Sequence, residues 1–228
     1  MDICMAGNEH ALLRELEADA RGLGFEYVAC GMRIPVPASR PRIVLLNNYP
    51  VAWQQRYRDR AYLLRDPTVQ HGRYSIRPLV WTDSLFERTR DLWEDARGHG
   101  IRYGWSQSTF DPRGIGCMVS VARSHEELGP TELVAKDALL RALANRTYLR
   151  LCEAFVPPRW QLCRELFTPR QLQVLSLTAD GKSCLDIGEI LCCSESNARY
   201  HVKGLLNMLS VPNKPAAVAR AWLLGAFA

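Results

Sequence analysis

Several features are missing from the sequence, and each absence narrows the class of protein. Its eight cysteines form no C-x-x-C pair and follow no signal-peptide pattern. We therefore expect reduced thiols in a cytoplasmic protein, not the disulfide framework of a small secreted domain. Adjacent Cys192 and Cys193 lack a histidine or second cysteine pair at zinc-ligand spacing, so neither a metal nor another cofactor is expected. No apolar run approaches the ~20 residues that cross a bilayer.

An excess of charge of one sign is also missing. The 228 residues carry 29 basic and 24 acidic side chains, and from Trp160 onward seven basic residues accompany five acidic ones. Such a weakly basic segment has few charges with which to release counterions from DNA, so DNA binding would require a dimer. The hydrophobic content of 47% is ordinary for a soluble globular protein, and the length allows two modest domains.

The most informative stretch is 194–209, SESNARYHVKGLLNML. A helical period places Ala198, Val202, Leu205 and Leu209 on one face, and Ser196, Arg199, Tyr200, Lys203 and Asn207 on the other. Ser194 stands where an N-cap belongs, so the helix should begin at Glu195. Basic side chains one turn apart on a free face suit guanine edges and phosphates in a major groove, although ordinary solvated helices often carry such a face.

The residues before this helix predict a helix-turn-helix. The sequence Thr168-Pro169-Arg170-Gln171 is a capping box with proline at the first helical position, and that helix should end at 180–181. Ser183 offers a second capped start, and its helix should run to Leu191, with Gly188 small enough for close approach of another helix. The turn 192–194 follows, and Asn213 can cap a fourth helix. We predict an all-α domain of four helices.

The segments LFTPRQLQVL, ADGKSCLDIGEIL and SESNARYHVKGLLNMLSV resemble the DNA-binding domain of LuxR-type transcription regulators. The resemblance spans 166–228 and implies that exposed residues of the helix beginning at Glu195 contact operator DNA, namely Ser196, Arg199, Tyr200 and Lys203. The sequence departs from the family pattern at Gln171, Gln173, Cys192, Asn197 and Gly204. Because the family often has glycine at the position of Cys192, we expect a left-handed backbone there, which costs a non-glycine residue about 1 kcal/mol.

The N-terminal part alternates blocks of strands and helices. Strands are expected at 25–32, 43–47, 105–110 and 116–122, and helices at 9–22, 50–60, 84–97 and 131–155. This order predicts an α+β domain, an α-β-α sandwich around an antiparallel sheet. Pro157 and Pro158 end the long last helix, whose apolar stripe suits either its own sheet or a second copy of the chain. We place the first domain at 1–155 and a linker at 156–165.

An aromatic cluster marks the candidate ligand site. Tyr49, Trp53 and Tyr57 repeat every four residues, and Tyr62, Asp66 and Trp81 follow. An aromatic core and a lined pocket both explain this pattern. Asp66 bears on the choice between an aromatic core and a pocket, because a carboxylate buried in either one needs a hydrogen-bond donor.

Trp53, Tyr57, Asp66, Pro67 and Trp81, with Gly104, resemble the signature of the autoinducer-binding domain that precedes the LuxR-type helix-turn-helix. The resemblance implies a dimeric regulator that binds an N-acyl-homoserine lactone and a pseudo-palindromic double-stranded operator. It assigns Trp53 to the lactone carbonyl, Asp66 to the amide N–H, and Tyr57 with Ser120 to the acyl carbonyl. Tyr49, Tyr62, Trp81, Trp105 and Met118 are expected to line the acyl chain or to pack the core. The stretch HGIRYGWS resembles orphan receptors of this family.

Three other hypotheses are weaker. A lactone hydrolase would need glycine at the end of Gly104-Trp105-Ser106-Gln107-Ser108, and a turn from strand to helix. A regulator of the same fold that answers a non-lactone signal, or no ligand, is the closer alternative, and the intact Trp53, Tyr57 and Asp66 argue against it. A receiver domain would require an acidic cluster after a first strand, which the N-terminal half lacks.

Overall fold

The computed structural model describes residues 9–35, 40–156 and 167–227, and it divides into two compact units. Of the described residues, the first unit contains 9–35, 41–111 and 115–155, and the second contains 167–227. Most of the predicted linker lies outside the described residues. Among the described helices, none combines the length and apolar character that a bilayer span requires.

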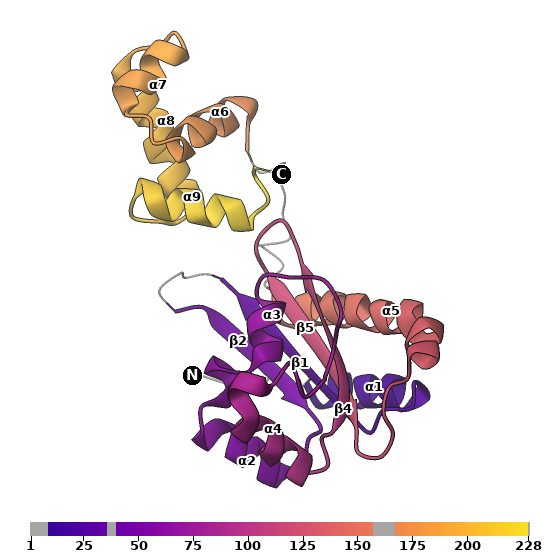
Figure 1. The fold of residues 1–228 in the computed structure, drawn as a ribbon. Helices are drawn as coiled ribbons and strands as arrows, with labels where there is room; N and C mark the ends of the chain where they lie inside the picture. The colour runs from indigo at the N-terminus through magenta and orange to yellow at the C-terminus, as the bar shows by residue number, and fades with distance from the viewer. Residues whose placement is uncertain (1–8, 36–39, 157–166, 228) are drawn as a thin grey trace. The chain divides into compact units, whose positions relative to one another are not determined.

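The N-terminal unit is built on a five-stranded antiparallel sheet with the strand order β2-β1-β5-β4-β3 (Figure 1). The strands are β1 (Tyr27–Ile34), β2 (Arg42–Asn47), β3 (Leu79–Val80), β4 (Tyr103–Phe110) and β5 (Gly116–Arg123). The helices are α1 (Glu9–Gly22), α2 (Val51–Asp59), α3 (Pro67–Gly72), α4 (Arg90–Gly98) and α5 (Pro130–Phe155), with 3₁₀ turns η1 (Tyr62–Leu64) and η2 (Glu87–Thr89).

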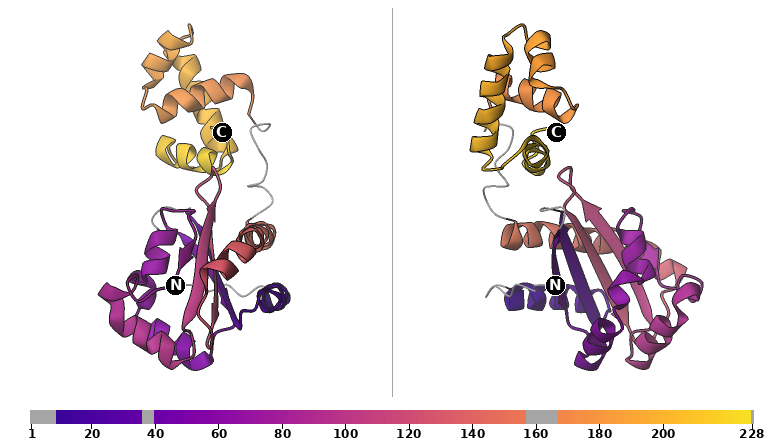
Figure 2. Two further views of the ribbon diagram at one scale, coloured as in Figure 1. Left: turned by 45° about the vertical axis from the view of Figure 1, so that its right-hand side comes forward. Right: turned by 90° about the vertical axis from the view of Figure 1, so that its left-hand side faces the viewer.

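Helices cover both faces of this sheet, as the sequence predicts. Helices α1 and α5 lie on one face, and α2, α3 and α4 lie on the other (Figure 2). Side chains alternate between the faces along each strand. Thr109 of β4 and Arg123 of β5 hydrogen-bond to α5, so odd-numbered side chains of these two strands point toward α5. The even-numbered side chains point to the opposite face, which we call the site face.

The long helix α5 packs on its own sheet through Leu140, Leu143, Thr147 and Leu151, all of which are buried. Ala154, predicted to belong to the same stripe, is exposed. The apolar stripe of this helix was expected to pack on its own sheet or on a second copy of the chain, and in this structure it packs on its own sheet.

A buried arginine ties the first turns of α5 to β5. The guanidinium of Arg123 donates to both carboxylate oxygens of Glu132, at 2.9 and 2.7 Å, and to the backbone carbonyls of Glu126 and Glu127. Lys136, which interrupts the apolar stripe, donates to Glu132 and to the carbonyl of Leu23. These cations hold the pKa of Glu132 down at about 2, against an ordinary value of 4.5.

Replacing Glu132 with glutamine is expected to lower the free energy of unfolding at neutral pH by about 3 kcal/mol, because it leaves a buried guanidinium without its carboxylate. A depressed carboxyl pKa stabilises the fold above the unfolded value of 4.5, and this contribution is lost as the pH falls toward about 2. The difference between variant and wild type should therefore shrink over that range. Urea denaturation followed by tryptophan fluorescence measures it.

Glu126→Gln is the matched control. Glu126 approaches the same Arg123 only to 3.9 Å, and its side chain is 72% exposed, whereas that of Arg123 is 4% exposed. Its replacement should change the free energy of unfolding by less than about 0.5 kcal/mol. Equal losses for the two variants would contradict the role assigned to Glu132.

The C-terminal unit contains α6 (Pro169–Ala179), α7 (Cys184–Ile190), α8 (Glu195–Met208) and α9 (Lys214–Leu223). Each of the four begins where its cap predicts. Thr168 and Ser183 form capping boxes, and Ser194 and Asn213 accept a backbone N–H of the first turn. The helices enclose a core that includes Val174, Leu175, Ile187, Ala198 and Ala221.

The turn between α7 and α8 is tight. A Cβ atom built on Gly188 would lie 2.8 Å from the carbonyl oxygen of Cys193 and 3.2 Å from the backbone nitrogen of Glu195, so only glycine fits without a shift. Cys192 has a φ of 52°, which confirms the left-handed conformation expected there. The predicted helix-turn-helix is thus confirmed down to its backbone.

One prediction for the N-terminal unit needs correction, and two of its elements were not predicted. The helix expected at 84–97 is a 3₁₀ turn followed by α4, which begins only at Arg90. Helix α3 and the short strand β3 were not predicted. The expected cap of α1, Asn8, lies outside the described residues.

Candidate functional site

The site face carries most of the aromatic and polar residues that the sequence singles out. Asp66 is a buried carboxylate on this face and is the N-cap of α3. Its Oδ1 accepts the backbone N–H of Thr68 at 2.8 Å and the Thr68 hydroxyl at 2.6 Å. Its Oδ2 accepts the Tyr57 hydroxyl at 2.8 Å. Helix α3 exists because proline follows this cap, and the cap fixes the direction of the carboxylate.

Burial raises the pKa of the Asp66 carboxyl, and the hydrogen bonds from Thr68 and Tyr57 oppose that rise. The pKa of the Tyr57 hydroxyl is raised well above its ordinary value by burial and by the negative charge of Asp66. Burial, followed by the same charge, also raises the pKa of Tyr49. Two neutral hydroxyls therefore lie near one buried acid, an arrangement that suits recognition of a polar ligand.

Trp53 lies at the centre of the aromatic packing. Its ring is 5.5 Å from that of Tyr57, 5.9 Å from that of Tyr62 and 5.6 Å from that of His99, measured between centroids. Tyr62 is 1% exposed, and its hydroxyl donates to Asp95 at 2.6 Å. The hydroxyl of Tyr62 is thus engaged in the core, and only its ring is shared with the site face.

Trp81 connects the aromatic cluster to the sheet. Its Nε1 donates to Ser106 Oγ at 2.9 Å, and Ser106 Oγ lies 2.7 Å from Ser120 Oγ. An indole N–H can only donate, so Ser106 accepts from Trp81. Either serine can be the donor between Ser106 and Ser120. The ring of Trp81 lies against the backbone of Gly104, where a Cβ atom would come within 2.4 Å of it. The sheet thus holds the hydroxyls of Ser106 and Ser120 side by side.

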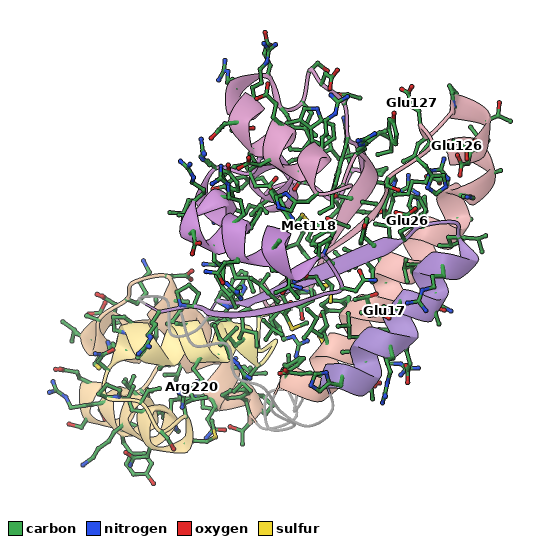
Figure 3. All side chains as sticks on the ribbon, turned by 90° about the horizontal axis from the view of Figure 1, so that it is seen from below. Glu17, Glu26, Met118, Glu126, Glu127 and Arg220 are labelled. Atoms are coloured by element: carbon green, nitrogen blue, oxygen red, sulfur yellow. The ribbon has the colours of Figure 1, made fainter. Side chains whose placement is uncertain are left out.

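The structure moves Trp105 away from this site. Trp105 is an odd-numbered residue of β4, on the side of Thr109, whose hydroxyl donates to Asn145 of α5 at 3.2 Å. Its buried ring therefore lies on the α5 face, and the prediction that it lines an acyl chain on the site face needs correction. The even-numbered Ser106 and Ser108 occupy the site face instead. Met118 on β5, labelled in Figure 3, lies on the same face.

Two surface hollows lie elsewhere. One of about 720 Å³ is bordered by α6 and α9, and one of about 250 Å³ lies between α1 and α5. Neither is lined by a residue of the predicted ligand site. The rings of Trp53, Tyr57 and Tyr62 pack against one another instead.

In the C-terminal unit, α8 presents the predicted polar face. Ser196, Arg199, Tyr200 and Lys203 are all exposed, while Ala198, Val202 and Leu205 are buried. Arg199 forms an ion pair with Glu195, one turn earlier on the same face. Two other arginines serve the fold: Arg170 donates to the carbonyl of Leu191 at 3.0 Å, and Arg220 to that of Leu209 at 2.8 Å.

Several residues of these sites were not predicted. Thr68 donates twice to Asp66, and the Asp-Pro-Thr order, a helix-capping pattern, was the available signal. The ion pair between Glu195 and Arg199 was also not predicted, and the available signal was their spacing of four residues on one helix. Ser106 had no such signal, because its role depends on strand register.

Comparison with known families covers both units. The family model of the autoinducer binding domain matches residues 8–151, and that of the bacterial regulatory proteins of the luxR family matches residues 165–221. The match to the autoinducer binding domain contains the Asp66 site, and the luxR match contains α6 to α8 and most of α9.

Curated relatives and solved structures agree with these matches. The transcriptional activator protein AnoR of Acinetobacter nosocomialis is 34% identical over 96% of this chain and 92% of its own length. The quorum-sensing regulator RhlR of Pseudomonas aeruginosa is 34% identical over 92% of this chain and 87% of its own. The crystal structure of Escherichia coli SdiA superimposes with a TM-score of 0.75 at 30% identity, covering 98% of this chain and 93% of that one. Another SdiA structure, with a TM-score of 0.73 at 30% identity over 97% of this chain and 90% of that one, is a complex with octanoyl-rac-glycerol.

These relatives are regulators of transcription, which removes the lactone hydrolase from consideration. The N-terminal unit has the autoinducer-binding fold, and the C-terminal unit has the helix-turn-helix that binds DNA. The chain belongs to the luxR family of bacterial regulatory proteins, as a quorum-sensing transcription regulator with an autoinducer-binding domain followed by a DNA-binding domain.

Proposed function

We propose that the signal bound by the N-terminal domain is an N-acyl-homoserine lactone and that Asp66 accepts its amide N–H. Thr68 donates twice to Oδ1 and Tyr57 once to Oδ2, and the backbone N–H of Val69 also acts on the carboxylate. A buried carboxylate beside the Tyr57 hydroxyl and the Trp53 ring is the observation that carries the proposal.

The other two polar groups of the ligand have partners nearby. The indole N–H of Trp53 donates to no partner among the described residues, and it suits the lactone carbonyl. Ser120 suits the acyl carbonyl, because Ser106 can donate to Ser120 and leave the Ser120 O–H for the ligand. The family resemblance also assigns Tyr57 to the acyl carbonyl, but its single O–H already donates to Asp66. We therefore give Tyr57 the role of orienting Asp66.

The acyl chain enters the core of the domain in this proposal. Each buried methylene contributes about 0.8 kcal/mol. Because binding is linked to folding, the lactone stabilises the folded receptor, and with it the dimer that we propose. Two copies of α8 then read the two halves of a pseudo-palindromic operator in the cytoplasm, and each compensates for the weak binding of the other.

Production of the full chain with a panel of acyl-homoserine lactones tests the proposal. Mass spectrometry of extracts from the purified protein should identify a lactone, and saturating lactone should raise the melting temperature by about 5 °C. Octanoylglycerol belongs in the panel, because it shares the acyl chain but lacks the amide N–H. If no lactone copurifies and neither melting temperature nor DNA affinity responds, the regulator answers another signal or none.

A further inference from the structure

Ser108 lies on the site face of β4, two residues after Ser106, which pairs with Ser120. Ser108 is 2% exposed, and its hydroxyl has no hydrogen-bond partner among the described residues. Strand alternation places it on the same face as Ser106, about 6.8 Å further along β4. A buried hydroxyl without a partner carries a free-energy cost that a bound acceptor would remove.

The surroundings of Ser108 are otherwise apolar. It pairs across the sheet with Met118, and Met118 pairs with Gly31, against whose backbone Leu45 packs. Helix α3 covers this row. A Cβ atom at Gly72 would lie 2.6 Å from Met118 Sδ and 2.7 Å from Ser108 Oγ, so the helix backbone passes directly over both side chains. The row thus suits an acyl chain, except for one hydroxyl.

We infer that Ser108 makes this receptor prefer acyl chains that carry an oxygen close to the acyl carbonyl, as in 3-oxo and 3-hydroxy acyl groups. This inference rests on the proposed function. Ser120 and Ser108 are diagonal neighbours on adjacent strands, which separates them by about 7–8 Å. Two hydrogen bonds of about 2.8 Å each cover most of that distance, so the second ligand oxygen must lie near the first.

Binding of three eight-carbon lactones tests the inference: N-octanoyl, N-(3-oxooctanoyl) and N-(3-hydroxyoctanoyl) homoserine lactone. Wild type should bind at least one oxygen-bearing lactone about tenfold more tightly than the unsubstituted one. In Ser108→Ala this ratio should fall to about twofold or less, because no hydroxyl remains to satisfy the second oxygen. The melting temperature of the variant should not fall, since the lost hydroxyl had no partner.

Thr109→Val is the control, because its hydroxyl faces Asn145 on the other side of the sheet. It should leave the ratio of affinities as in wild type. An unchanged ratio in Ser108→Ala, or a wild type without preference, overturns the inference and leaves the proposed function intact. Failure of wild type to bind any of the three lactones overturns both.

Discussion

Asp66→Asn is expected to raise the lactone concentration needed for half-maximal response by about a hundredfold or more. The change removes a charge-assisted hydrogen bond worth about 1.5–3 kcal/mol, and it can also turn an amide N–H toward the N–H of the ligand. The helix cap should survive, because asparagine caps as well as aspartate. A reporter driven by the target promoter, read over a lactone titration, measures the effect.

The stability of this variant separates loss of binding from loss of folding. Burial raises the pKa of Asp66 above its value in the unfolded chain, so ionisation of Asp66 costs stability as the pH rises through that raised pKa. Asparagine removes this cost, and the melting temperature without lactone should be unchanged or higher at neutral pH. For the same reason, lactone affinity of the wild type should fall as the pH drops through the raised pKa of Asp66, and that of the variant should not.

Asp91→Asn provides the surface control. Asp91 is exposed and forms an ion pair with Arg65. This substitution should leave lactone response within about twofold of wild type, because exposed pairs contribute little. A normal lactone response in Asp66→Asn would remove the basis of the proposed ligand pose.

The second large effect concerns DNA. Joint replacement of Arg199 and Lys203 by alanine should weaken binding to the operator by about a hundredfold or more at constant salt. Each contact with a base edge or phosphate is worth about 1–3 kcal/mol, and a dimer loses each contact twice. Both side chains are exposed, so the melting temperature should stay the same. A fragment selected from random DNA with the wild-type protein serves as the probe in an anisotropy titration.

Glu195→Gln is the complementary test on the same helix. In the free protein, Glu195 holds Arg199 in an ion pair and repels phosphate. Its replacement should therefore strengthen binding to random-sequence DNA by several-fold and leave the helix cap at Ser194 in place.

Operator binding that survives joint replacement of Arg199 and Lys203 would show that α8 is not the helix that reads the operator.

The fold of the C-terminal domain could be predicted almost completely from sequence, because its signals are local. Thr168, Ser183, Ser194 and Asn213 each cap a helix through groups two or three residues away. The left-handed Cys192 was expected from the glycine that the family often has at this position, and its φ of 52° confirms it. The same locality explains why α1, α2 and α5 were placed to within one or two residues.

The N-terminal site was predicted less completely, because one residue there serves two purposes. Asp66 was interpreted as a ligand acceptor, and its role as the cap of α3 was overlooked. Helix α4 begins only at Arg90, after a 3₁₀ turn, and Phe86 before that turn stacks on Trp93 with ring centroids 4.4 Å apart, a contact that helix periodicity does not predict. Local patterns thus identified which residues matter but not the partners that orient them.

The sequence by itself determined the helical domain, the blocks of strands and helices, and the candidate residues Trp53, Tyr57 and Asp66. Only the tertiary structure assigned sides: it put Trp105 toward α5, joined Trp81 to Ser106 and Ser120, and left Ser108 without a partner. The reason is strand register. A shift of one residue reverses the face of every side chain in a strand, and register is set by pairing between segments far apart in the chain.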